Sequence, residues 1–193
     1  MPNITFKNVA KTALYVSTIC GIGYFAALMF LHVTGLSMTG WIEWIFRIAI
    51  IVCITWTIIG FRMKYAPRGM GFGAAFGLGM LSSLIVGLYM ALGIFIFQTA
   101  VAPDYNENYR AYYRGKRSDQ MYNTQLNKQI KEKGETYKLT ASDSTIVEKG
   151  LNLHLEKVAF HFSARGSATI NIIFSLVWGI AIAATLSFLA RKK

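Results

Sequence analysis

The sequence predicts an all-α integral membrane protein with four transmembrane helices and a long, partly helical loop between the third and fourth. Of its 193 residues, 54% are hydrophobic and only 15% are charged, whereas soluble domains carry about a quarter charged residues. The charges concentrate in residues 102–168. Outside that segment lie four apolar runs, each of about 20 residues or more, the helical length that crosses a hydrocarbon core of about 30 Å.

The four runs cover residues 14–33, 41–61, 72–101 and 170–189, and they predict a single membrane domain over residues 1–193. The first run follows basic residues, as a signal peptide does, but its apolar core exceeds the usual 7–15 residues and a second span follows closely. We therefore expect an uncleaved helix. The third run would be about 45 Å long as a helix, so it must tilt, break or project beyond the lipid. Its glycine-rich start is where we expect irregularity.

Basic residues flank the apolar runs on one side. The N-terminal tail, the second connection and the C-terminus hold eight of them, and the first connection holds none. Because short basic segments stay in the cytoplasm, we expect both termini there (N-in/C-in) and the long loop in the periplasm. These clusters also explain most of the net charge of +11 without a nucleic-acid partner. The eight residues are Lys7, Lys11, Arg62, Lys64, Arg68, Arg191, Lys192 and Lys193.

The loop, residues 102–168, begins with Ala102-Pro103, which ends the third helix because proline cannot continue it. Residues 104–133 suit a helix with an apolar stripe every four residues. Residues 135–150 are polar and predict turns. From 151 to 162 the apolar residues fit the spacing of a strand and of a helix, so both stay open at this point.

Small residues recur every four positions in the third and fourth runs. Such rows let helix backbones approach closely, so we expect the two rows to pack against each other or to form a seam with a partner or a second copy. A pore lining is the weaker alternative. The residues assigned to helix packing or a partner interface are Gly69, Gly71, Gly73, Gly77, Gly79, Gly87, Ser175, Gly179 and Ala183.

Few polar residues interrupt the apolar runs. Glu43 and Arg47 lie one helical turn apart with the acid first, the favourable order for an ion pair. Tryptophans surround them, so an ion pair at the membrane interface is favoured over a functional site. His32 is expected to anchor the same interface. Asn171 and Gln98 are expected to hydrogen-bond between helices.

Aromatic and basic residues cluster directly after Pro103. Such mixtures bind nucleic acid in soluble proteins, but beside a transmembrane helix they favour contact with lipid or a partner. Tyr109, Arg110, Tyr113 and Arg114 are our candidates for this contact, within a cluster that also holds Tyr105, Tyr112, Lys116 and Arg117.

Catalytic and metal-binding patterns are not found in the sequence. His154 and His161 lack the further ligands that a metal site requires, so surface histidines are favoured. Walker loops, nucleophile elbows and dinucleotide fingerprints are missing. We therefore expect no cofactor, no metal and no enzymatic activity.

Four features carry a resemblance to a known family. They are the basic exit from the second helix at residues 60–65, the glycine-rich start of the third at 71–79, the Ala102-Pro103 closure and the basic end at 191–193. In these the chain resembles the bacterial four-helix membrane proteins called domain of unknown function 4199. The resemblance implies a single four-helix domain in the cytoplasmic membrane of a Gram-negative bacterium, with no established activity. Members lie near genes for membrane glycosyltransferases, which implies an accessory role.

Two functional hypotheses lead. The first is a non-enzymatic accessory or scaffold subunit of a bacterial inner-membrane complex, assisting a membrane glycosyltransferase or other envelope machinery. The alternative is a small oligomeric transporter, channel or lipid-handling protein. A membrane enzyme would need polar side chains converging at one depth, which the sequence does not indicate. The expected partners are the lipid bilayer and another membrane protein or a second copy of the chain, with no nucleic acid.

Overall fold

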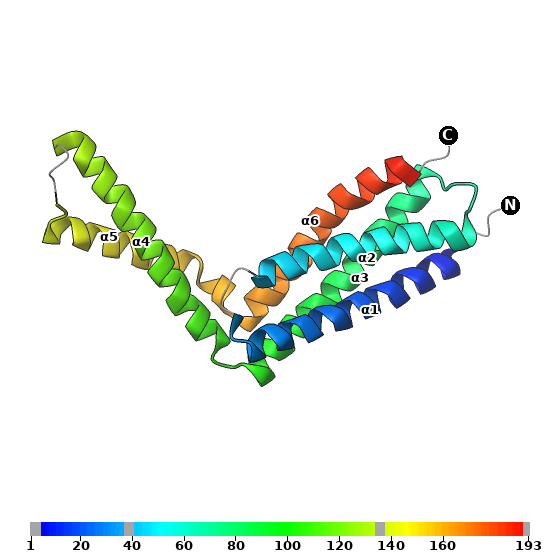
Figure 1. Ribbon diagram of the computed structural model, residues 1–193, viewed down its shortest axis with the longest axis horizontal. Coiled ribbons are helices and arrows are strands. Elements are labelled where there is room, and N and C mark those ends of the chain that lie inside the picture. The colour runs from blue at the N-terminus through cyan, green and yellow to red at the C-terminus, as the bar shows by residue number, and fades with distance from the viewer. Residues whose placement is uncertain (1–4, 37–40, 134–137, 191–193) are drawn as a thin grey trace.

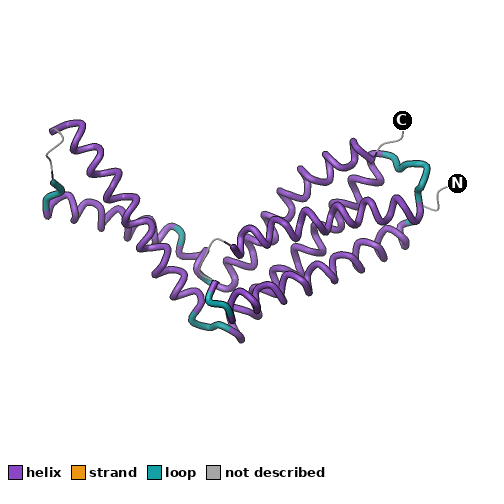
Figure 2. The backbone as a smooth tube through the Cα atoms, in the orientation of Figure 1, coloured by secondary structure: helices purple, strands orange, loops and turns teal. Residues whose placement is uncertain are grey.

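The computed structural model describes residues 5–36, 41–133 and 138–190, and within them the chain is helical. Helices α1, α2, α3 and α6 form a bundle, and α4 and α5 form a hairpin that leaves one end of it (Figure 1). No strand is present among the described residues, as Figure 2 also shows. The elements are α1 Phe6–Val33, α2 Trp41–Tyr65, α3 Phe72–Ile96, the π-helical η2 Phe97–Val101, α4 Tyr105–Lys133, α5 Ala141–Lys157, the 3-10 turn η3 Ala159–Phe162 and α6 Ala164–Ala190.

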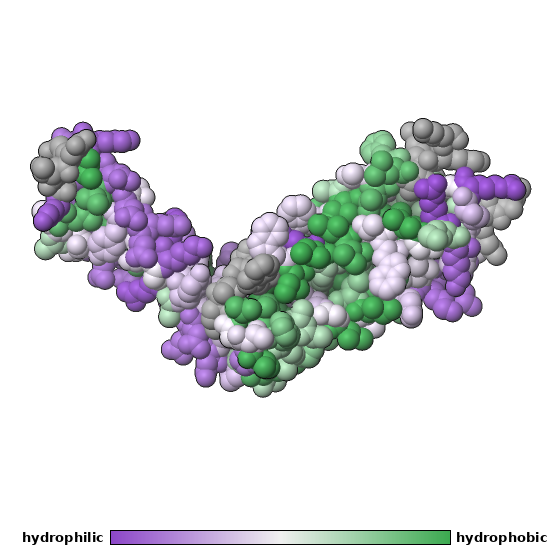
Figure 3. All heavy atoms as spheres, in the orientation of Figure 1, coloured by the Kyte–Doolittle hydropathy of each residue, from purple (hydrophilic) through white to green (hydrophobic). Residues whose placement is uncertain are grey.

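Among the described residues, four helices are long and apolar enough to cross a membrane, which confirms the predicted all-α class with four candidate spans. Figure 3 shows hydrophobic residues over the bundle and hydrophilic residues over the hairpin and at the opposite end of the bundle. The helices extend beyond the predicted spans: α1 begins at Phe6, before the span predicted from residue 14, and α6 begins at Ala164, before the span predicted from residue 170. Each helix continues through polar turns that are too hydrophilic to be counted in a predicted span. Helix α1 begins where the Thr5 side chain accepts a hydrogen bond from the Asn8 N–H and caps the first turn.

The long third run is irregular at its end and not at its glycine-rich start, so that expectation is wrong. Helix α3 is regular from Phe72, and Gly69, with φ at 100°, lies in the connection before it. The chain turns π-helical at Phe97–Val101, where the Ala102 N–H donates to the Phe97 carbonyl at 2.8 Å. Glycines inside α3 are tolerated because helix packing offsets their low helix propensity.

The expected turn region at 135–150 is wrong from residue 141, where α5 begins. Thr140 and Asp143 form a reciprocal capping box, in which the Thr140 N–H donates to Asp143 Oδ2 at 3.0 Å. Such a box satisfies the free N–H groups of the first turn and starts a helix in a polar sequence. Of the two alternatives for residues 151–162, strand and helix, the structure shows a helix up to Lys157, followed by η3. Residues 134–137 lie outside the described part.

The two rows of small residues face each other along a contact that we call the α3–α6 seam. Ser83 donates its hydroxyl hydrogen to the Ser175 carbonyl across it. A methyl group added at Gly79 would lie 2.6 Å from the Ala183 Cβ, too close for any real contact. The missing side chains therefore set the distance between the two backbones. The contacting pairs are Gly79–Ala183, Ser83–Gly179 and Gly87–Ser175.

The remaining packing candidates lie outside this seam. Added methyl groups at Gly71, Gly73 and Gly77 would meet nothing within 4 Å, and Gly69 precedes the helix. These four glycines do not bring two helices of this chain together. Their assignment to an interface with a partner stays a prediction.

A buried cluster of hydroxyl and thiol groups joins α1, α2 and α3, and the sequence analysis missed most of it. Ser17, Cys53, Thr57 and Ser82 have no exposed surface. The Ser82 hydroxyl lies 2.9 Å from that of Thr57 and 3.2 Å from that of Ser17. Every member has a partner, so the cluster links helices in the way that polar residues do inside membranes.

We predict that Gly87→Leu destabilises the bundle by about 1–3 kcal/mol, because its side chain would be forced into Ser175 across the seam. Gly73→Leu is the matched control, since it lies on the same helix in open space. Thermal unfolding of both variants in mild detergent measures the difference. Equal midpoints for the two variants would show that the seam does not limit stability.

Candidate functional site

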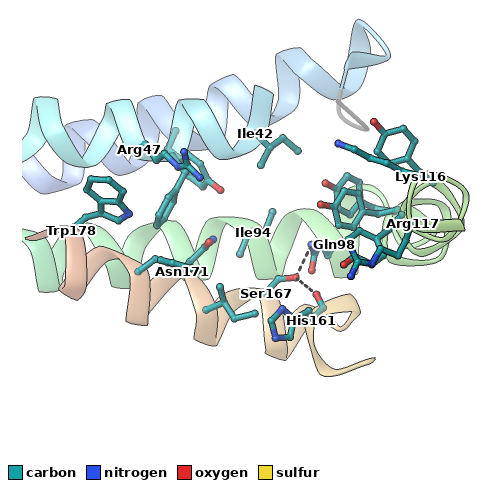
Figure 4. A pocket seen from close by; sticks show the side chains of 18 of the residues that line it. Ile42, Arg47, Ile94, Gln98, Lys116, Arg117, His161, Ser167, Asn171 and Trp178 are labelled. Atoms are coloured by element: carbon teal, nitrogen blue, oxygen red, sulfur yellow. Dashed lines mark hydrogen bonds between the residues drawn. The ribbon is translucent and has the colours of Figure 1, made fainter. Parts of the chain in front are cut away.

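A cleft of about 610 Å³ lies where the bundle meets the hairpin, and we call it the junction cleft. All four bundle helices and α4 contribute to it, together with η2 and η3. Figure 4 shows Arg47, Asn171 and Trp178 at one end and Lys116 and Arg117 at the other, with Gln98 and Ser167 between them. The lining residues are Tyr24, Ile42, Phe46, Arg47, Ile94, Gln98, Tyr105, Tyr109, Tyr112, Tyr113, Lys116, Arg117, Gln120, His161, Ser167, Ile170, Asn171, Phe174 and Trp178.

The bundle end of the junction cleft combines an apolar wall with two polar side chains, Arg47 and Asn171. Its wall contains the aliphatic and aromatic side chains of α2, α3 and α6. Tyr24 is 2% exposed and packs edge-on against Phe46, with ring centroids 6.2 Å apart. Its side chain also interacts with Asn171 on α6. Phe174 and Trp178 are 51% and 42% exposed, so this end opens toward the surroundings of the bundle.

The hairpin end is held in place by tyrosines on the first turns of α4. Tyr105 packs edge-on against Phe97 at 5.4 Å and stacks on Tyr109 at 5.8 Å. Residues four apart share one face of a helix, which explains why Tyr109 and Tyr113 both contact Phe162 of η3. This aromatic contact fixes the start of α4 against the end of the bundle.

The charge in the junction cleft is positive. Arg47, Lys116 and Arg117 line it together with His161, and the described lining includes no Asp or Glu. The Arg47 guanidinium lies 5.2 Å from the centre of the Trp44 ring. Clefts with low-dielectric walls and one sign of charge concentrate ions of the opposite sign. The predicted partner of Arg47, Glu43, has its side chain outside the described residues.

Two buried polar atoms in the lining have no hydrogen-bond partner among the described residues: Gln98 Oε1 and Arg117 Nε. Gln98 is only 5% exposed, and its Nε2 donates to Ser167 Oγ at 3.3 Å. Leaving such a group unpaired costs about 1–3 kcal/mol. Gln98 belongs to η2, and π-helical turns occur often at functional sites. The wall of the junction cleft therefore contains an acceptor and a donor that the described residues leave unpaired.

The structure brings together some of the predicted site residues and separates others. Arg47, Asn171, Tyr109 and Tyr113 line the cleft. Arg110 and Arg114 are exposed and take no part in the lining, and His32, also exposed, packs its ring against Phe97 at 5.5 Å.

Sequence reasoning missed the apolar wall and Ser167 as site residues. It also missed that one face of α4 carries the positions that line the cleft: 109, 113, 116 and 120. Helical periodicity was the available signal for that face. No local pattern marks the wall residues, since each resembles any other lipid-facing position.

Metal chemistry finds no support in the part of the chain that the structure describes. There, no three residues among His, Cys, Asp and Glu come together as ligands could. His154 accepts or donates a hydrogen bond with the Tyr113 hydroxyl at 3.0 Å, which gives it a structural role between α4 and α5.

Four membrane-length helices with a polar hairpin at one end fit a multi-pass helical membrane protein. The chain belongs to the family described as protein of unknown function (DUF4199), which matches residues 4–192. The resemblance noted in the sequence is thereby confirmed over nearly the whole chain. No curated protein and no solved structure matches it.

Proposed function

We propose that the protein binds a membrane amphiphile in the junction cleft and that its task is lipid handling without catalysis. One observation carries the proposal: a single cleft runs from an apolar wall on the bundle to a basic, tyrosine-lined end on the hairpin. Its volume of about 610 Å³ lies in the range of ligand pockets, about 300–1,000 Å³. An amphiphile likewise has an apolar part and a polar or charged head group.

The exposed aromatic residues support entry from the membrane. Phe174 and Trp178 are about half exposed on the outside of the bundle while also lining the cleft. Acyl chains surrounding the bundle would contact these side chains. Tyrosine and tryptophan favour the boundary between lipid and water because each ring has an apolar body and a polar tip. A lipid could thus enter sideways without leaving the bilayer.

Filling the cleft tests this proposal. Ile170→Trp places a large ring in the lining, and we expect at least a tenfold loss of lipid carried through purification in mild detergent. Ile173→Trp is the matched control, because Ile173 lies on the same helix, is 55% exposed and does not line the cleft. Native mass spectrometry counts bound lipid per protein. Equal lipid retention by both variants would refute binding in this cleft.

A second role, as a non-enzymatic accessory or scaffold subunit of a bacterial inner-membrane complex, rests on a different observation. The start of α3 presents Gly73 and Gly77 on one face with open space beside them. Small residues facing outward allow a helix of another protein to approach closely. The partner would be a second copy of the chain or another membrane protein, such as a membrane glycosyltransferase or other envelope machinery.

The double variant Gly73→Leu, Gly77→Leu should lose this partner while keeping the wild-type unfolding midpoint. Gly23→Leu is the control, since it too adds a side chain in open space, on α1. A pull-down of tagged chain from its native membrane, with mass spectrometry of the captured proteins, measures the association. An unchanged set of partners in the double variant would count against the glycine face.

We also propose that both termini lie in the cytoplasm of a bacterium, with the protein in its inner membrane and the hairpin in the periplasm. The start of α1, the end of α6 and the connection between α2 and α3 lie at the same end of the bundle, opposite the hairpin (Figure 1). Arg62, Lys64 and Arg68 lie at or near that connection. Lysine and arginine favour the cytoplasmic side of short connections.

Labelling of exposed positions tests this orientation. A membrane-impermeant maleimide added to intact spheroplasts should label Glu148→Cys in α5 and leave Lys64→Cys unlabelled until the cells are lysed. The wild-type chain gives the background from Cys20 and Cys53, which lie within the bundle helices. The reverse pattern would place the termini in the periplasm.

A further inference from the structure

We propose that the occupant of the junction cleft is an anionic phospholipid, whose phosphate binds Lys116 and Arg117 and whose head-group hydroxyl binds Gln98. This assignment rests on the proposed lipid-handling role and adds the chemistry of the head group. Three features of the cleft lead to it: its charge, its unpaired polar atoms and the order of polar and apolar residues along it.

Charge decides between anionic and zwitterionic lipids. Lys116 and Arg117 are neighbours on α4 at the hairpin end, and Arg47 lines the other end. The described lining residues include no carboxylate that would balance Lys116 and Arg117. A zwitterionic head group would bring its own cation next to these side chains. An anionic head group brings only negative charge, so it is favoured electrostatically.

The Arg117 side chain is prepared to donate to a phosphate. Its Nη1 donates to Gln120 Oε1 at 3.0 Å, which orients the guanidinium group. Its Nε is buried and has no partner among the described residues. An ionised oxygen is the strongest acceptor for such a donor, and phosphate presents several.

Gln98 indicates a second group on the same ligand. The amide is fixed by its bond to Ser167, whose hydroxyl in turn donates to the His161 carbonyl at 3.2 Å. The remaining Gln98 Oε1 can only accept, so it needs a donor that phosphate lacks when fully ionised. A hydroxyl beside the phosphate, as in a glycerol head group, provides one. A quaternary ammonium has no hydrogen to donate.

The apolar wall next to Gln98 and Ser167 matches a lipid and not a free phosphate. Ile94 lies one helical turn before Gln98, and Ile170 lies close to one turn after Ser167, so the apolar lining begins about 6 Å from the polar pair. Lys116 and Arg117 lie on the other side of that pair (Figure 4), so a head group whose phosphate binds them must fold back toward the apolar wall for its hydroxyl to reach Gln98. A free phosphate would leave the apolar end without a ligand.

The test compares lipids of one acyl composition. Purified full-length protein in mild detergent is titrated with phosphatidylglycerol and with phosphatidylcholine, and native mass spectrometry gives both affinities. We expect phosphatidylglycerol to bind at least tenfold more tightly, because it lacks the choline cation that Lys116 and Arg117 would repel and has a hydroxyl that can donate to Gln98. Lys116→Gln, Arg117→Gln should abolish the preference. The double variant Arg110→Gln, Arg114→Gln is the control, because it removes the same charge from exposed positions of α4. It should keep the preference for phosphatidylglycerol.

Gln98→Leu separates binding from folding. It should weaken phosphatidylglycerol binding several-fold without lowering the unfolding midpoint of the lipid-free protein, because removal of the unpaired Oε1 offsets the lost hydrogen bond to Ser167. A lower midpoint together with unchanged binding would overturn the role of Gln98.

The outcomes distinguish the two proposals. Equal affinity for the two lipids would overturn the head-group assignment and leave lipid handling in place. Binding of neither lipid would overturn both. Displacement of phosphatidylglycerol by inorganic phosphate at equal concentration would show that the cleft recognises free phosphate, which also overturns the lipid assignment.

Discussion

The close approach of α3 and α6 is the constraint on which the rest of the bundle depends. Glycines and serines on both helices let the two backbones meet where any larger side chain would collide. Helix α6 consequently packs mainly on α3 and much less on α2. The junction cleft lies between α2 and α6 at the end of the bundle where the hairpin joins α3 to α6. Helix α6 is thus packed tightly against α3 on one side and borders the junction cleft on the side that faces α2.

Two sets of polar groups in the bundle differ in how completely they are paired. The hydroxyl and thiol cluster around Ser82 is closed, since each of its members hydrogen-bonds to another. Gln98 in the junction cleft keeps one amide atom unpaired. Polar groups in a low-dielectric interior are costly unless satisfied, so the closed cluster is structural, whereas the open one is suited to a ligand. The two sets of groups are both polar, and they differ in whether every hydrogen-bonding atom has a partner among the described residues.

The hairpin and the bundle form the site together. Pro103 and the π-helical turn before it end the third span, and the edge-on packing of Tyr105 against Phe97 directs α4 away from the bundle. The same face of α4 then carries Tyr109, Tyr113 and Lys116 over the cleft. Basic residues that hydropathy assigns to a loop thereby lie beside apolar residues from three spans.

The sequence by itself determined the four spans, the family and the small-residue rows, because hydropathy and four-residue spacing are properties of single helices. It also indicated Arg47, Asn171 and the tyrosines of α4 as residues of interest. Only the tertiary structure decided which rows meet and that Gln98, Ser167 and Arg117 lie in one cleft. These depend on contacts between segments far apart in the chain, and no local pattern contains that information.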